Sequence, residues 1–565
     1  MLKASGAMAV ATLTSRVLGM VREMVYMSFM GTGWVNDAFQ YAFMIPNLFR
    51  RLLGEGALTA AFIPVFKQKE KNHGEVEMWR AANAVLSGLV VAACAIVAVV
   101  LLLVSIALAY GTPATAPLVA AGSAVAQTVL PHGTAATHGV AGTGAAVSFW
   151  APGQFPPKIV LMLRLLRVMF PYMVLVCLTA VMMGMLNARG HFFIPAMGAT
   201  TLNVVMIASV WWFAPHLGLA LPLEQRLPEQ IFALAFGVLA AGVAQAGFQL
   251  PTLWRDGFRY RWVSPWRDAT VRHVVRQMIP GTIGVAAFQI NVTLVQGVAL
   301  FVGTGIVSQF NGAVRLMELP QGMFGISLAT YLLPTLSGLA AEKNYPEFRA
   351  TLRQGLATLI FLNLIASVLL FTLAEPIVRL LFERGAFSKV STGHVAYALS
   401  CLAPGLVAFS LSNILARAFY ALGDTQTPMK ISLVCLTLNF AIACLLLGPL
   451  REGGPGIANL ITSAISVGLL IFTLRKKLGK LEMAPLRRTI VPLLLGAVVA
   501  GVIAWSSWQA WEKFLGHGNL ALKIGAVFVP AGIAGGVYWF GALAGKIPAA
   551  KEMTEFALTK FKRRK

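Results

Sequence analysis

Arginines inside apolar segments are the feature of this sequence that could do chemistry. An arginine at the centre of a membrane span costs roughly 2.5–3.5 kcal/mol, and that cost is tolerated mainly where the charge lines a wet cavity or binds a ligand. Acidic residues close to these arginines in sequence are few: Glu23, Asp37, Glu55 and Glu318. The pattern predicts a positively charged cavity for an anionic cargo. The basic residues concerned are Arg16, Arg22, Arg50, Arg51, Arg315 and Arg417.

The first pair lies in the first apolar segment, which we interpret as a membrane helix rather than a cleaved signal peptide. Arg16 and Arg22 are about 9 Å apart along a helix and about 120° apart around it. They could therefore share the wall of a broad cavity. The alternative is that both side chains reach toward the helix ends.

The second pair follows a proline. Pro46 inside a span predicts a bent helix, whose freed backbone donors would add to the charge of Arg50 and Arg51 at an anion site. Adjacent residues diverge by about 100° around a helix, so at most one arginine points straight into a cavity. The other could pair with Glu55. An internal arginine–glutamate pair without a ligand is the alternative reading.

Further along the chain, Arg315 and Glu318 are spaced to pair on one helix face. A charged pair at membrane depth still indicates function. Arg417 is expected near the cytoplasmic end of its span, where it could reach the interface.

Composition fixes the class of protein. The chain has 565 residues, of which 58% are hydrophobic and 12% charged, and its mean hydropathy is +0.75. Soluble proteins carry about 25% charged residues, so the sequence predicts an all-α integral membrane protein. The net charge of +24 lies in short clusters between apolar segments and in the tail, which favours an anionic membrane surface over nucleic acid.

Cofactor and enzyme signatures are not found in the sequence. The five cysteines lie in apolar spans without metal or redox spacing, and no zinc-protease, Walker or nucleophile-elbow motif occurs. We therefore expect a transporter with no cofactor and no metal, driven by membrane potential, a monovalent ion or the gradient of its cargo.

A span needs about 20 apolar residues, and the sequence contains fourteen such segments. The loops at 67–80, 254–276, 340–353 and 475–488 and the C-terminal tail are basic, and strict alternation places them on one side. Basic loops face the cytoplasm, so both termini are expected there. The predicted spans are 5–29, 36–66, 81–110, 160–187, 192–214, 230–253, 277–302, 306–339, 352–373, 392–421, 428–449, 455–474, 489–509 and 519–545.

The segment 111–149 is rich in Ala, Gly, Thr and Val and has no Asp, Glu, Lys or Arg. An extra span would reverse every later loop and destroy the charge asymmetry, so we favour an insertion in an external loop. His132 and His138 lie in it, and two loop histidines are weak evidence for a metal site.

An internal duplication organises the spans. Proline-containing ends at Pro64 and Pro334, and glycine–proline turns at 190–195 and 423–428, recur in the two halves. The repeats contain an even number of helices, so they are expected to share one orientation as two six-helix lobes related by a pseudo-two-fold axis. The predicted domains are 1–254, 255–475, a final helix pair at 476–545 and a basic tail at 546–565.

At these residues the sequence resembles the MurJ (MviN) family of lipid II flippases, within the multidrug/oligosaccharidyl-lipid/polysaccharide exporter superfamily. The resemblance runs from about residue 5 to the tail, except for the insertion. The motifs that carry it are Ser15-Arg16-Val-Leu-Gly, Asn36-Asp37-Ala-Phe, Pro46-Asn47-Leu-x-Arg50-Arg51-x-x-x-Glu55-Gly56-Ala, Arg315-Leu-Met-Glu-x-Pro320 and Leu381-Phe-Glu-Arg-Gly-Ala-Phe387.

The resemblance implies a function in bacterial cell-wall synthesis. Such proteins move lipid II, an undecaprenyl-diphosphate-linked disaccharide-pentapeptide, from the cytoplasmic to the periplasmic leaflet of the plasma membrane by alternating access. It also implies a tail groove in the final helix pair and, as further partners, membrane lipids and cell-wall synthesis enzymes. The implied substrate-binding residues are Arg16, Arg22, Asp37, Arg50, Arg51, Glu55, Arg315 and Glu318.

Two departures from the family pattern stand out. Val314 precedes Arg315 where many relatives have an aspartate, and the 111–149 insertion is not expected. Three other readings stay open: an exporter of drugs or small cations, a flippase for another polyprenyl-linked glycan, and a scaffold for cell-wall enzymes. The excess of bases over acids in the spans disfavours the first, and the long motifs disfavour the second.

Overall fold

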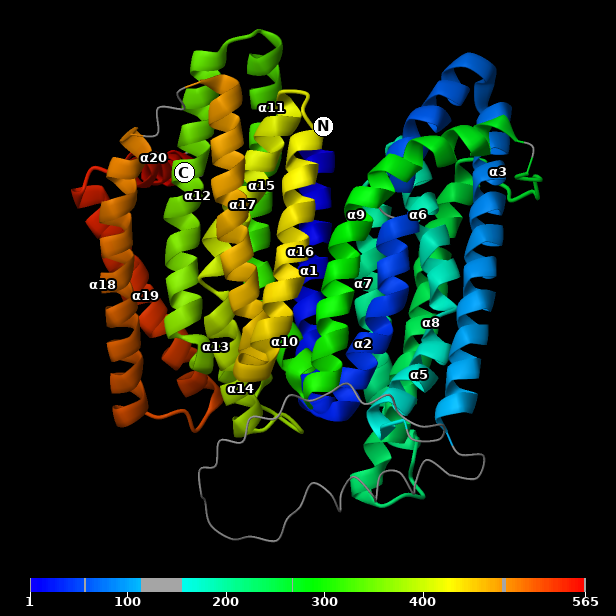
Figure 1. Cartoon of the computed structure of the whole chain (residues 1–565), viewed down its shortest axis with the longest axis horizontal. Helices are drawn as coiled ribbons and strands as arrows, with labels where there is room; N and C mark the ends of the chain where they lie inside the picture. Colours follow the sequence, from blue (N-terminus) through cyan, green and yellow to red (C-terminus); the bar gives the residue numbers. More distant parts are fainter. Residues whose placement is uncertain (1, 55–56, 113–154, 267, 480–483, 563–565) are drawn as a thin grey trace. The chain divides into compact units, whose positions relative to one another are not determined.

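The structure is a computed structural model that describes residues 2–54, 57–112, 155–266, 268–479 and 484–562. Throughout these ranges the chain forms helices and short connections, and no strand occurs in them. The predicted all-α class is therefore confirmed (Figure 1).

The chain divides into two compact units, residues 1–293 and 294–565. The division falls inside α9 (Ala269–Val302). Val274 of α9 belongs to a core cluster of the first unit, and Val295 packs with Ala443 and Ala458 of the second. The predicted lobe boundary between 254 and 255 and the two C-terminal domain boundaries stay predictions.

In the first unit, α3 contains parts of two predicted spans, because Gly74 adopts a left-handed φ of 82° that breaks the helix between them. Helix α7 packs on α1 and α8, and α6 packs on α3 and α8. These contacts bury a core that includes Phe62, Phe66 and Met185. The helices are α1 (Leu2–Met30), α2 (Trp34–Phe49), η1 (Arg50–Gly54), α3 (Ala57–Gly111), α5 (Pro157–Met169), α6 (Tyr172–Ala188), α7 (Phe193–Ala208), η2 (Ser209–Phe213), η3 (Ala214–His216) and α8 (Leu223–Arg255).

In the second unit, α12 packs on α15 and α18, and α18 pairs with α19. Phe361 of α12 stacks on Tyr538 of α19, which anchors the last helix pair to the unit. The helices are α10 (Ile306–Pro320), η4 (Gln321–Ile326), α11 (Ser327–Ala341), α12 (Tyr345–Thr372), α13 (Ala374–Phe382), α14 (Lys389–Leu402), α15 (Gly405–Ala421), α16 (Gln426–Leu450), η5 (Arg451–Gly453), α17 (Gly454–Leu478), α18 (Ala484–Phe514), α19 (Leu520–Ala544) and α20 (Pro548–Lys562).

Seven helical segments of the described chain are long and apolar enough to cross a membrane, or nine if each bent pair is one span. Two of the seven, Phe62–Gly111 and Gln426–Leu478, each cover parts of two predicted spans. In the part of the chain that is described, all fourteen predicted spans fall on helices. The protein is therefore a multi-pass membrane protein, and its helices are consistent with fourteen spans.

The two repeats share local irregularities. The α5–α6 pair and the α14–α15 pair are each bent by 45°, at Pro171 and at Pro404, where a proline interrupts the helical hydrogen bonds. A π-helical turn also occurs at corresponding places, η1 beginning at Arg50 and η4 beginning at Gln321. The two units thus share these two departures from regular helix, as a duplication predicts.

Two elements correct the sequence analysis. The range 374–391 was predicted as a loop, but α13 forms there because Val378 and Phe382 are buried and Arg379 forms ion pairs with Glu375 and Glu512. The range 546–565 was predicted only as a basic tail, but it contains α20. That helix packs on α12 and α19, with Thr554 accepting a hydrogen bond from Trp539 at 3.1 Å.

Candidate functional site

Arg22 is held in place by a neighbouring helix. Its guanidinium donates a hydrogen bond of 3.1 Å to the side-chain oxygen of Asn203 on α7, and the Asn203 amide donates one of 3.1 Å to the backbone carbonyl of Ser15. The guanidinium also lies 5.5 Å from the centre of the Tyr26 ring. Its side chain is 12% exposed. This arrangement fixes the position of a positive charge within a predicted span.

The charge of Arg22 is not cancelled by a close ion pair. The nearest carboxylate oxygen that it faces in the described chain belongs to Glu23, at 3.8 Å, which is a long contact for a charge-assisted hydrogen bond. The Nε atom of Arg22 is buried and has no hydrogen-bond partner among the described residues. The guanidinium therefore keeps one hydrogen-bond donor unused within the described chain. Arg16, on the same helix, is exposed.

Arg50 and Arg51 open the π-helical turn η1. Arg51 is exposed and donates a hydrogen bond of 3.2 Å to the side-chain oxygen of Gln289 on α9, whereas Arg50 is half-buried. The two side chains thus have different surroundings, in keeping with the divergence expected for adjacent helical residues. Glu55, the predicted acidic partner, lies outside the described residues.

The arginines of α1 and η1 lie at different depths. At about 1.5 Å per residue, Arg22 lies about 12 Å from the end of α1 and Arg50 about 24 Å from the start of α2. These two helix ends meet at the turn 31–33. The first unit therefore offers positive charge at successive levels through the membrane, which suits a route for an anion better than a single clamp.

Asp37 is fully buried in the first turn of α2, and its carboxylate attracts the ammonium of Lys158 on α5. The helix N-terminus also favours a negative charge there. Asp37 thus faces one half-buried cation, Lys158, which was not predicted as its partner from the sequence.

In the second unit, the predicted pair forms as expected. The Arg315 guanidinium donates a hydrogen bond of 2.9 Å to the Glu318 carboxylate on α10, and the two side chains are 44% and 48% exposed. Because its side chain is exposed, Arg315 stays accessible. An exposed pair of this kind also contributes little to the stability of the fold. Arg417 is half-buried on α15.

Ion pairs also link helix ends and connections near the basic loops. Arg189 donates hydrogen bonds to Glu70 and Glu75, at 2.7 and 2.9 Å, on either side of the Gly74 break. A hydrogen bond from Lys67, with help from Arg189, lowers the pKa of Glu70. A hydrogen bond of 2.6 Å from Lys477 and backbone contact with Thr427 hold the pKa of Asp424 well below its usual range. These pairs fasten connections rather than form a pocket.

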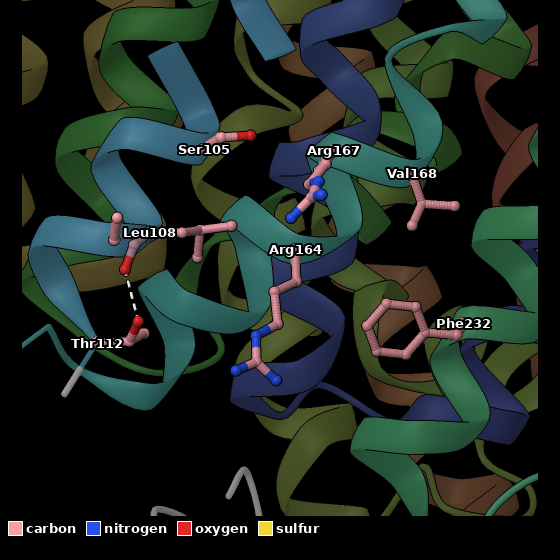
Figure 2. Close-up of a pocket in the computed structure, with 8 residues that line it drawn as sticks. Ser105, Leu108, Thr112, Arg164, Arg167, Val168 and Phe232 are labelled. Atoms are coloured by element: carbon pink, nitrogen blue, oxygen red, sulfur yellow. Dashed lines mark hydrogen bonds between the residues drawn. The ribbon is translucent and has the colours of Figure 1, made fainter. Parts of the chain in front are cut away.

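Two further arginines were not predicted as site residues from the sequence. Arg164 and Arg167 of α5 line a pocket with side chains from α3 and α8 (Figure 2). They lie near the start of a span, where arginine is ordinary in sequence, so only the recurrence at three-residue spacing could have indicated a shared face. In the described part of the chain, no group of three or more His, Cys, Asp or Glu side chains could hold a metal ion.

Comparison with known proteins places this arrangement in a family. Residues 26–134 and 132–522 match the family described as lipid II flippase MurJ. A probable lipid II flippase MurJ of Rhizobium tropici is 32% identical over 537 residues, spanning 94% of this chain and 92% of the relative. Lipid II flippase MurJ of Burkholderia cenocepacia is 32% identical over 500 residues, spanning 87% and 88%.

Solved structures agree on the fold. The inward closed conformation of a lipid II flippase MurJ has a TM-score of 0.67 at 19% identity, covering 95% of this chain and 99% of that chain. An inward-facing multidrug resistance MATE family transporter of the MOP superfamily has a TM-score of 0.61 at 13% identity, covering 84% and 99%. The resemblance seen in the motifs is thus confirmed, and the chain belongs to the lipid II flippase MurJ family.

Proposed function

We propose that this protein is a lipid II flippase, a transporter rather than an enzyme, that moves the lipid-linked peptidoglycan precursor from the cytoplasmic to the periplasmic leaflet. The observation that carries the proposal is Arg22, a membrane-depth arginine that Asn203 holds without a close carboxylate. Relatives that match nearly the whole chain are named as lipid II flippases or probable lipid II flippases.

The charge of the cargo suits these residues. A diphosphate carries about two negative charges, and arginine forks bind phosphate oxygens with two parallel hydrogen bonds. We propose Arg16, Arg22, Arg50 and Arg51 of the first unit as diphosphate-binding residues, and Arg315 as a further one on α10. Asp37, Glu55 and Glu318 are proposed to tune these charges. Alternating access is the proposed mode of transport.

The proposed setting is the bacterial plasma membrane, with both termini in the cytoplasm. The basic loops support that orientation. Because the sequence contains no nucleotide-binding motif, membrane potential or a monovalent ion is the proposed driving force. Lipid II and membrane lipids are the proposed partners, with cell-wall synthesis enzymes as further candidates.

The proposal can be tested with purified protein in vesicles that contain fluorescent lipid II. Wild-type protein should move the probe between leaflets, and Arg22→Gln should slow it at least about tenfold, because one charge-assisted contact is worth roughly 1.5–3 kcal/mol. The control variant is Arg272→Gln, which removes one positive charge at an exposed position of α9. This variant should move the probe at the wild-type rate. Equal rates for wild type and Arg22→Gln would contradict the proposal.

A further inference from the structure

The first unit has a pocket of about 690 Å³ that is separate from Arg22, Arg50 and Arg51. It lies where α3, α5 and α8 meet, near the ends of these helices that are remote from the basic loops 67–80 and 254–276. A volume of this size is typical of ligand sites. The lining side chains are Ser105, Leu108, Ala109, Thr112, Arg164, Arg167, Val168 and Phe232.

The pocket is positively charged. Arg164 and Arg167 are one helical turn apart on α5 and share a face. No acidic side chain lines the pocket, and neither guanidinium has a hydrogen-bond or ion-pair partner in the part of the chain that the structure describes. Figure 2 shows both guanidinium groups reaching out from α5, with Ser105 of α3 and Thr112, which follows α3, on one side and Phe232 of α8 on the other.

The hydroxyl groups complete a set of polar contacts for an anion. Thr112 donates its hydroxyl proton to the carbonyl of Leu108 at 2.6 Å, a bond drawn in Figure 2, whereas Ser105 can direct its hydroxyl into the pocket. Two arginine guanidinium groups and a serine hydroxyl can donate hydrogen bonds to the oxygens of a phosphate.

Exposed apolar side chains surround the pocket, as is typical of a protein surface that contacts lipid. Leu102, Leu103 and Ile106 of α3 are 61%, 58% and 57% exposed, and Phe236 of α8 is 58% exposed. In a multi-pass membrane protein, apolar side chains this exposed contact acyl chains. The pocket thus joins a cationic recess to an apolar surface that acyl chains can cover.

The location is unusual for arginine. Basic residues gather at the ends of spans that carry the basic loops, and Arg164 and Arg167 lie at the opposite ends. Basic pockets between membrane helices on the cytoplasmic side bind anionic lipid headgroups, and the same contact between guanidinium and phosphate is chemically available in the other leaflet. Such a contact would offset the cost of placing two unpaired cations there.

We propose that Arg164 and Arg167 bind the phosphate headgroup of an anionic membrane lipid, in the leaflet opposite the basic loops, with its acyl chains along α3 and α8. The site is independent of the proposed transport function, because it requires neither lipid II nor movement of the protein. A lipid with a phosphate and no compensating cation, such as phosphatidylglycerol, fits this chemistry.

Binding can be measured with the full chain in nanodiscs or mixed micelles. The purified protein is titrated with fluorescent phosphatidylglycerol or phosphatidylcholine. Binding of the lipid is measured by energy transfer from the protein's tryptophans to the fluorescent group. Arg164→Gln/Arg167→Gln should weaken phosphatidylglycerol binding about tenfold or more. Arg164→Lys/Arg167→Lys, which keeps the charge, should bind several times more tightly than the glutamine variant. Arg272→Gln/Arg276→Gln on α9 is the control with the same loss of charge.

The outcomes separate the alternatives. Wild-type binding by the glutamine variant, or equal weakening in the α9 control, would overturn the proposal. Equal binding of phosphatidylcholine would show an apolar surface without headgroup recognition. Displacement of the lipid by millimolar inorganic phosphate would assign the pocket to a soluble anion instead. If the glutamine variant does not fold, the lysine variant decides: it must prefer phosphatidylglycerol over phosphatidylcholine as wild type does.

Discussion

Asn203 of α7 accepts a hydrogen bond of 3.1 Å from the Arg22 guanidinium and, through its amide, donates one to the carbonyl of Ser15 on the same helix as Arg22. One amide thus bridges an arginine and the backbone of α1. Because an amide carries no charge, it orients the guanidinium without neutralising it. A carboxylate at that place would do the opposite.

This relationship predicts opposite consequences for two substitutions. Asn203→Ala should slow lipid II translocation by about tenfold, because Arg22 loses its orientation but keeps its charge. Asn203→Asp should slow it further, although it strengthens the bond, because a carboxylate cancels the charge offered to the diphosphate. Vesicle translocation of fluorescent lipid II, normalised to folded protein, measures both.

The matched control is Asn439→Ala on α16, where the amide bonds to Asn459 and Thr462. It should lower stability without changing translocation per folded molecule. An Asn203→Asp variant as fast as wild type would show that Arg22 does not meet the cargo.

The buried carboxylate of Asp37 gives a second prediction. Asp37→Asn leaves Lys158 without its counter-charge and should lower the free energy of unfolding by roughly 1–3 kcal/mol. The double variant Asp37→Asn/Lys158→Met should recover most of that loss, because no unpaired charge remains. Thermal unfolding in detergent measures the difference. A double variant no more stable than Asp37→Asn would show that the two side chains are not coupled.

The sequence predicted the helices well but only some of their irregularities. Apolar length located the spans, because a membrane helix must satisfy its backbone internally. It did not predict the 45° bends at Pro171 and Pro404, nor α13, whose nine residues are too short for a clear apolar period. Helix α13 depends on ion pairs of Arg379 with side chains distant in sequence, such as Glu512.

The candidate site was predicted in its charges rather than in its contacts. The Arg315–Glu318 pair followed from helical spacing and is present. The partners of Arg22, Arg51 and Asp37 come from other helices, namely Asn203, Gln289 and Lys158. Only packing brings these partners together, and one sequence contains no record of it.

The Arg315–Glu318 pair predicts that stability and function separate. Both side chains are close to half-exposed, so Glu318→Gln and Arg315→Ala should each change the free energy of unfolding by less than about 1 kcal/mol. Arg315→Ala should nevertheless abolish support of cell growth, because its guanidinium is a proposed cargo contact. Growth after depletion of the native protein, alongside immunoblotting of membrane levels, measures this. Normal growth with Arg315→Ala would remove that residue from the site.

Asp424 predicts acid sensitivity at a connection. Hydrogen bonds from Lys477 and Thr427 hold its pKa well below its usual value, so the folded state binds the proton less readily than the unfolded state does. The stabilisation is present above about pH 4 and is lost as pH falls further. Asp424→Asn should lower the free energy of unfolding at pH 7 by about 1 kcal/mol. Its melting temperature should also fall less between pH 5 and pH 3 than that of wild type. An equal fall in the melting temperatures of Asp424→Asn and wild type between pH 5 and pH 3 would contradict this prediction.

The most direct test of the central claim is the leaflet distribution of lipid II in cells depleted of this protein and supplied with wild type, Arg22→Ala or Arg315→Ala. Lipid II should accumulate in the cytoplasmic leaflet on depletion, and only wild type should restore its appearance in the periplasmic leaflet, with all three proteins at equal levels in the membrane. An unchanged distribution on depletion, or restoration by both arginine variants, would contradict the account.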